Sequence, residues 1–177
     1  MTAIAAQGGR RVEWQTVGVA VAIYGGWLAI VLLHEVVPWP VGAVLLAVVI
    51  AWHGSLQHEV LHGHPFTNPW ANEVVGSIPI SLRLPFRVYR RSHISHHESE
   101  DLTDPATDTE SFFITAATCA RLPARGRCVL IAHHTLLGRM LLGPLVENVS
   151  MVRRDAAAIR AGDRPLLRWW AVHLATA

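Results

Sequence analysis

The amino-acid sequence predicts an all-α integral membrane protein, in which an N-terminal transmembrane hairpin precedes cytoplasmic and interfacial helices. Hydrophobic side chains make up 51% of the 177 residues and charged ones only 16%, whereas about a quarter of the residues are charged in a typical soluble domain. The apolar residues are concentrated near the N-terminus, since Glu35 carries the only formal charge between Trp14 and Trp52. The chain also has 11 histidines, which are its most unusual chemical feature.

Two apolar runs, residues 17–33 and 41–52, predict the hairpin. At about 1.5 Å per residue, the expected spans 14–37 and 40–63 are long enough to cross a hydrocarbon core of about 30 Å. The segment Pro38-Trp39-Pro40 separates them and is typical of a tight turn at a membrane surface. A cleaved signal peptide is the alternative for the first run. That run is long for a signal sequence, lacks a small-residue cleavage site and continues directly into the second run.

The remaining chain is expected to lie at the cytoplasmic side. Arg10 and Arg11 precede the first run, so the positive-inside rule places them in the cytoplasm and returns the second helix to that side. Residues 64–168 predict a cytoplasmic and interfacial segment, in which the interrupted apolar stretch 129–146 forms a helix lying in the interface. Residues 169–177 resemble the start of a further transmembrane helix. We therefore expect residues 1–177 to be the N-terminal part of a longer protein.

Charge and cysteine content exclude several kinds of site. A net charge of +2 is too small to argue for a nucleic-acid partner. Two cysteines, Cys119 and Cys128, are too few for a disulfide framework, a four-thiolate iron–sulfur cluster or a cysteine-based zinc site. Any bound metal would therefore be held by imidazole and carboxylate.

Two histidine clusters are the candidate metal ligands. His58 and His62 are four residues apart, so on a helix they project from one face, and Gly63 is expected to help end that helix. The second cluster, His93, His96 and His97, brings three imidazoles together on another helix. Surface histidines or hydrogen-bonded core histidines explain either cluster alone. Two such clusters next to a membrane exit favour a metal site.

Two other functions fit part of this pattern. Residues 58–62 match the HExxH motif, in which two histidines bind zinc and the glutamate acts as a general base. A zinc peptidase leaves the second histidine cluster without a role. A non-catalytic metal-binding or transport protein is the other alternative, but a transporter is expected to carry ionisable residues midway through its spans, and residues 17–33 and 41–52 have none.

The full ligand set favours iron. Five imidazoles exceed what one tetrahedral zinc ion uses, and imidazole with carboxylate suits iron, so two ions are expected. In these features the chain resembles the membrane fatty acid desaturases and related hydroxylases, whose first two histidine boxes have the spacings H-x3-4-H and H-x2-3-H-H. His58 with His62, and His93 with His96 and His97, match them. Residues 56–65 and 96–111 look like the bacterial acyl desaturase branch, and the resemblance covers residues 14–177.

The resemblance implies a function and its partners. It implies a desaturase that uses two irons and O2 to introduce a double bond into a lipid acyl chain, in a bacterial inner membrane with the histidine boxes on the cytoplasmic side. A related hydroxylase of alkanes, sterols or carotenoids is the nearest alternative. The sequence has no nucleotide-phosphate loop or flavin-type glycine fingerprint, so the resemblance implies a separate electron donor, either a ferredoxin or a cytochrome b5-like protein.

The chain departs from the family pattern at the third histidine box. His133 and His134 lack a partner three residues earlier, and the resemblance places the missing box beyond Ala177. Four acidic residues are candidates to orient the ligand histidines: Glu59, Glu98, Asp101 and Asp104. Four arginines are candidates to contact lipid phosphate, an acyl-carrier headgroup or an acidic electron donor: Arg83, Arg87, Arg90 and Arg91.

Overall fold

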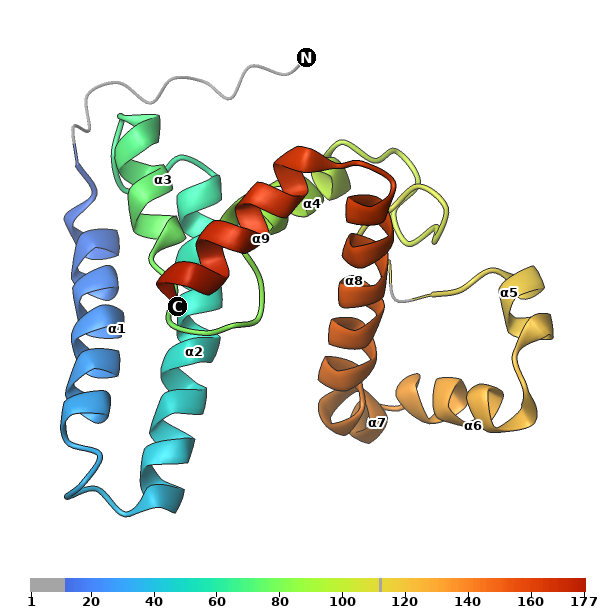
Figure 1. Ribbon diagram of the computed structural model, residues 1–177, viewed down its shortest axis with the longest axis horizontal. Helices are drawn as coiled ribbons and strands as arrows, with labels where there is room; N and C mark the ends of the chain where they lie inside the picture. Colours follow the sequence, from blue (N-terminus) through green and yellow to red (C-terminus); the bar gives the residue numbers. More distant parts are fainter. Residues whose placement is uncertain (1–11, 112) are drawn as a thin grey trace. The chain divides into compact units, whose positions relative to one another are not determined.

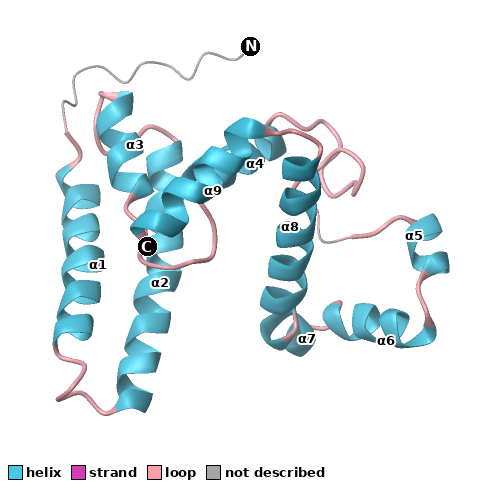
Figure 2. Ribbon diagram, in the orientation of Figure 1, coloured by secondary structure: helices cyan, strands magenta, loops and turns pink. Residues whose placement is uncertain are grey.

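All regular elements are helices in the part of the chain that the computed structural model describes, residues 12–111 and 113–177 (Figures 1 and 2). The only pairing of strand type described there is an isolated bridge between Val12 and Phe66. The helices are α1 (Trp14–Leu32), α2 (Trp39–Leu61), α3 (Pro69–Ser77), α4 (Phe86–His97), α5 (Ala116–Arg121), α6 (Ala124–His133), α7 (Leu136–Leu141), α8 (Gly143–Arg160) and α9 (Arg164–Thr176). The prediction of an all-α protein is confirmed.

The chain divides into two compact units. The first extends to Phe86 and includes His173–Ala177, and the second comprises Arg87–Val172. Each unit positions one of the two histidine clusters, and each is described by itself below.

In the first unit, α1 and α2 pack side by side as a helical hairpin (Figure 1). Both helices have a mean hydropathy of 1.7 and are long enough to cross a membrane. Only 11% of each apolar window is buried inside the protein, whereas the core helix of a soluble protein is mostly buried. Arg10 and Arg11, on which the predicted orientation depends, lie outside the described residues. The two helices are therefore candidate membrane spans, as the sequence predicts.

Helix α3 is joined to the hairpin by polar contacts at its C-terminal end. The last carbonyl groups of a helix have no partner within it, and two of them are satisfied here by side chains. The Tyr24 hydroxyl donates to the Val75 carbonyl oxygen at 2.6 Å, and Gln57 Nε2 donates to the Gly76 oxygen at 2.9 Å. Because Tyr24 uses its single proton for Val75, it accepts from Nε2 of His53, 3.1 Å away. These bonds fix the last turns of α2, which carry the first histidine cluster.

The end of α2 is set by glycine, as predicted. His62 follows the last helical residue, and Gly63 has a φ of 99°, in the left-handed region that glycine adopts without strain. The turn then passes close to the start of α1, where His64 Nδ1 lies 2.8 Å from a carboxylate oxygen of Glu13. The Asn72 side chain holds the same loop by bonding both the N–H and the carbonyl oxygen of Phe66.

The second unit holds α4 against the beginning of α9. Arg91 of α4 donates to Asp163 at 3.2 Å, and its guanidinium carbon lies 5.2 Å from the centre of the Trp169 ring. Asp163 also accepts the N–H of Leu166 at 2.9 Å, which caps the first turn of α9. Arg91, one of the four arginines that are candidates for an external contact, therefore also makes intramolecular contacts.

The stretch 129–146, expected to form a helix, is divided among three. The segment contains the end of α6, the whole of α7 and the beginning of α8. The Thr135 hydroxyl makes the corner, because it donates to the Ala132 oxygen at 2.7 Å and accepts the Gly138 N–H at 3.0 Å. Hydrophobicity alone did not reveal this break, whereas Thr135 is a typical helix N-cap residue.

Candidate metal centre

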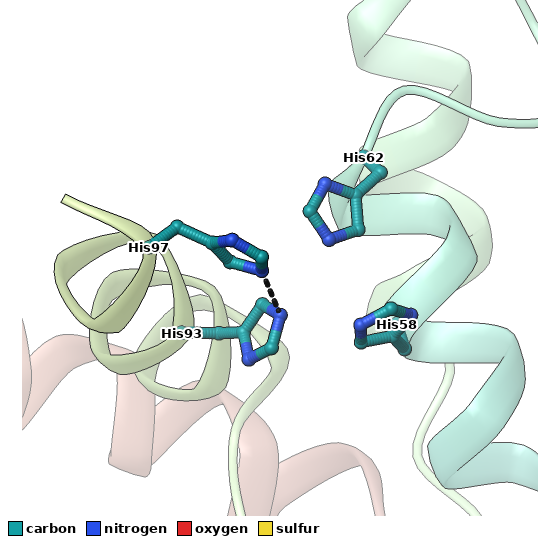
Figure 3. A group of neighbouring side chains, drawn as sticks. All are labelled: His58, His62, His93 and His97. Atoms are coloured by element: carbon teal, nitrogen blue, oxygen red, sulfur yellow. Dashed lines mark hydrogen bonds between the residues drawn. The ribbon is translucent and has the colours of Figure 1, made fainter. Parts of the chain in front are cut away.

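The first histidine pair lies on the last turns of α2 (Figure 3). The ring centres of His58 and His62 are 4.8 Å apart, and one ring nitrogen of each lies within 4.8 Å of the other. The spacing of four residues on a helix therefore has the predicted consequence, since both imidazoles project from one face. Neither is buried: His58 is partly exposed and His62 is exposed.

The second pair lies on α4, one turn apart (Figure 3). Nε2 of His93 and Nε2 of His97 are 2.9 Å apart, and their ring centres are 4.6 Å apart. Two nitrogens bound at right angles to one ion at about 2.1 Å would be about 3.0 Å apart. The pair therefore has the separation of two ligands on one metal, and without the metal the same nitrogens share a proton.

His96, the third predicted ligand of this cluster, is oriented differently. Its ring centre lies 6.1 Å from that of His93, and its Nδ1 lies 2.7 Å from a carboxylate oxygen of Asp108. That contact uses Nδ1, so Nε2 is the atom with which His96 is able to bind a metal. The structure thus pairs His93 closely with His97, and gives His96 a separate position on the same helix.

Two carboxylates fix the orientation of His93 and His96 on α4. Glu110 accepts from Nδ1 of His93 at 3.0 Å, and Asp108 accepts from Nδ1 of His96. Such a carboxylate holds a histidine in the tautomer that presents Nε2 to a metal and increases the basicity of that nitrogen. This arrangement is typical of metal-binding histidines, and it is the observation that best fits the residues to a metal.

The loop after α4 is folded around Asp108. Its buried carboxylate also accepts the N–H groups of Thr103 and Glu110, each at 2.8 Å. Thr103 has a φ of 75°, a conformation that a β-branched residue rarely adopts. Ser111 Oγ donates to the Thr103 carbonyl oxygen at 2.6 Å. The loop therefore holds a strained backbone residue in order to place one acidic side chain.

These contacts shift the ionisation of both partners. The donated N–H groups, that of Thr103 first, and the bond from His96 lower the pKa of Asp108 to about 2. The hydrogen bond to Asp108 raises the pKa of His96 above its ordinary value. Asp108 is consequently an anion at neutral pH, which is the form that accepts a hydrogen bond from a metal-bound imidazole.

The sequence prediction of the orienting acids was incomplete. Of the four candidates, Glu59 lies 3.6 Å from Nδ1 of His58, which is a long contact, and Asp104 accepts the backbone N–H of Ala106. Glu98 and Asp101 are both exposed. Asp108 and Glu110 take the role instead. Both lie in an irregular loop with turns, where no periodicity in the sequence marks which side chains face the histidines.

Other histidines lie outside these pairs. His34 is exposed and bonds the Val31 carbonyl oxygen, and His64 pairs with Glu13. His133 is buried, with Nε2 beside Gly143 at the start of α8. None of these joins a group of potential ligands within the described residues.

Few classes of protein combine an all-helical fold, two candidate membrane spans and histidines arranged to hold a metal. The family model described as fatty acid desaturase matches residues 35–177. The chain therefore belongs to the fatty acid desaturase family, and the resemblance inferred from the histidine boxes is confirmed at that level. A comparison with curated proteins and one with solved structures found no match.

Proposed function

We propose that the protein introduces a double bond into a lipid acyl chain in an O2-dependent reaction at a di-iron centre. The proposed iron ligands are His58, His62, His93, His96 and His97. The observation that carries the proposal is the pair of carboxylate-to-histidine contacts on α4, found in a chain of the desaturase family. Such contacts are expected of metal ligands and have no role in a site that uses only the HExxH residues.

Each residue has a defined task in this proposal. The ring nitrogens of His58 and His62 and of the α4 histidines bind the ions. Asp108 keeps His96, and Glu110 keeps His93, in the binding tautomer. When bound, the irons supply the oxidising power, taken from O2, that removal of hydrogen from an unactivated methylene requires. Protein side chains alone supply no such oxidant.

The proposed surroundings follow from the apolar hairpin and the family. An acyl chain enters from the lipid phase beside the candidate spans α1 and α2. The electrons come from a separate protein, a ferredoxin or a cytochrome b5-like donor. The site faces the cytoplasm of a bacterial cell, in agreement with the position of Arg10 and Arg11 before the first span.

The proposal is tested in cells with the protein produced from its native gene. We expect the wild-type gene to increase unsaturated acyl chains in extracted lipids, measured by gas chromatography with mass spectrometry, and the purified protein to contain iron. Separate His62→Ala and His96→Ala variants are expected to lose both the increase in unsaturated acyl chains and the bound iron. His34→Ala is the matched control, because His34 is exposed and its ring bonds the Val31 carbonyl oxygen. This variant is expected to retain both the unsaturated acyl chains and the iron.

Three results would overturn the proposal. Hydroxylated products in place of alkenes would indicate the hydroxylase alternative. Zinc in place of iron, with Glu59→Gln abolishing activity, would indicate the peptidase. Unchanged alkene levels in the His96→Ala variant would exclude His96 as a ligand.

A further inference from the structure

Helix α7 exposes an unusually apolar face. Four of its six residues are large apolar side chains with most of their surface exposed: Leu136 at 78%, Leu137 at 66%, Met140 at 69% and Leu141 at 69%. Exposed apolar residues continue on either side, at Ile131 in α6 and Leu145 in α8. Contiguous apolar surface of this kind marks an interaction site in a folded protein.

The apolar face is opposite the side by which α7 packs on its neighbours. At about 100° per residue, the four exposed side chains fall within one sector of the helix, and Gly138 points away from it. Gly138 is buried, and an added Cβ would overlap the carbonyl oxygen of Ala132. Backbone contact with α6 therefore fixes the rotation of α7, so its apolar face cannot turn inward.

The formal charges within residues 111–146 are all positive, and the first acidic residue after them is Glu147. Residues 111–146 contain four arginines, Arg121, Arg125, Arg127 and Arg139, and no aspartate, glutamate or lysine. Arg125 and Arg127 are exposed on α6, which packs against α7. A basic surface next to an exposed apolar helix is complementary to anionic lipid headgroups above acyl chains. The same charge disfavours a second copy of the chain at this face, because like charges would be brought together.

We propose that α7 inserts its apolar face into the headgroup and acyl boundary of an anionic membrane, with Arg125 and Arg127 at the lipid phosphates. The segment α6–α7 is then a second membrane contact in addition to the α1–α2 hairpin. This contact lies in the unit that carries the α4 histidines. The proposal does not depend on metal binding or on the reaction catalysed.

The test measures the depth of single spin labels in the full chain, reconstituted in nanodiscs. Cys119 and Cys128 are both free and are first replaced by serine. A nitroxide is then attached to Leu137→Cys or to the control Ala157→Cys, an exposed site on α8. Power saturation gives the collision rates with O2, which concentrates in lipid, and with a neutral nickel chelate, which stays in water.

We expect O2 to dominate at position 137 and the nickel chelate to dominate at position 157. The ratio of the O2 collision rate to the nickel-chelate collision rate at position 137 should be larger in nanodiscs that contain phosphatidylglycerol than in nanodiscs of phosphatidylcholine alone. Exchanging Arg125 and Arg127 for glutamine should remove that difference between the lipids.

Each other outcome overturns the proposal. Nickel access at position 137 would mean that the face is in water. Low access to both reagents would mean that protein covers it, either a second copy or another segment. An equal ratio of the two collision rates in both lipids would mean that the arginines do not bind the anionic headgroups. Loss of folding is detected separately, because the α1–α2 hairpin keeps the protein in the nanodisc while circular dichroism reports its helix content.

Discussion

The Asp108 carboxylate makes three hydrogen bonds, one to His96 and two to backbone N–H groups of its own loop. An asparagine at this position keeps the size of the side chain but loses the charge and one acceptor. We expect Asp108→Asn to lower metal affinity about 10- to 100-fold, the usual cost of losing a carboxylate behind a ligand histidine. Competition with a chromophoric chelator on the purified protein measures the change.

Asp101→Asn is the matched control for this prediction. Asp101 is an exposed acid of the same loop, so its substitution removes the same charge without touching a ligand histidine. The control should bind metal as the wild type does. Equal losses in both variants would mean that the net charge of the loop, and not the orientation of His96, controls affinity.

At the scale of helices, the Asp163 carboxylate links α4 to the beginning of α9, since it accepts from both Arg91 and the Leu166 N–H. The Leu166 N–H, and then Arg91, lower the pKa of Asp163 below its ordinary value. A group with a depressed pKa in the folded state adds stability above its unfolded pKa, near 3.9 for aspartate, and that stability is lost as the pH falls through the folded pKa. The contribution should therefore be complete at neutral pH and disappear in acid.

Two variants separate the charge of Asp163 from its capping role. Asparagine also caps helices well, so Asp163→Asn should lose only the ion pair, and Asp163→Ala should lose both. In thermal unfolding of the detergent-purified protein, we expect Asp163→Asn to melt below the wild type at pH 7 and together with it at about pH 2. A difference that is independent of pH would exclude an electrostatic cause.

Because α3 packs closely against Phe86, a methyl group added at Gly76 should lower the stability of the fold, whereas a methyl group added at an open position should not. A Cβ added at Gly76 would lie 2.7 Å from carbon atoms of the Phe86 ring, which is itself buried. Gly76→Ala should therefore destabilise the fold by about 1–3 kcal/mol, the usual cost of overpacking. Gly18→Ala, where no atom lies within 4 Å of the added methyl, should be neutral or slightly stabilising, because alanine favours the helix. Chemical denaturation of the two variants compares them directly.

At the scale of the whole molecule, the features predicted correctly from the sequence are those that depend on local patterns of residues. The all-α class, the candidate spans and the turn at Gly63 follow from apolar runs, prolines and glycine, which act locally. The α6–α7 corner was missed because the prediction followed the apolar side chains of residues 129–146 and gave no weight to Thr135, whose hydroxyl caps the start of α7. The histidine pairs followed from helical spacing, whereas Asp108 and Glu110 did not, because the path of an irregular loop depends on tertiary contacts that spacing does not encode.

The proposed centre also predicts that metal and stability are linked. A metal that binds the folded protein and not the unfolded chain stabilises it, by about 2.7 kcal/mol when the free metal is at 100 times its dissociation constant. Removing iron with a chelator should therefore lower the melting temperature, and adding Fe²⁺ under anaerobic conditions should restore it. His62 lies in one unit and His97 in the other, so the two residues provide a test of shared ligation.

If both clusters serve one di-iron centre, His62→Ala and His97→Ala should each lose most of the iron-dependent rise in melting temperature, and the double variant should lose little more. Independent sites would instead give two partial losses that add together. The control His34→Ala should keep the full rise. Additive losses would exclude a common centre while leaving family membership intact, since the match over residues 35–177 does not depend on how the metal is held.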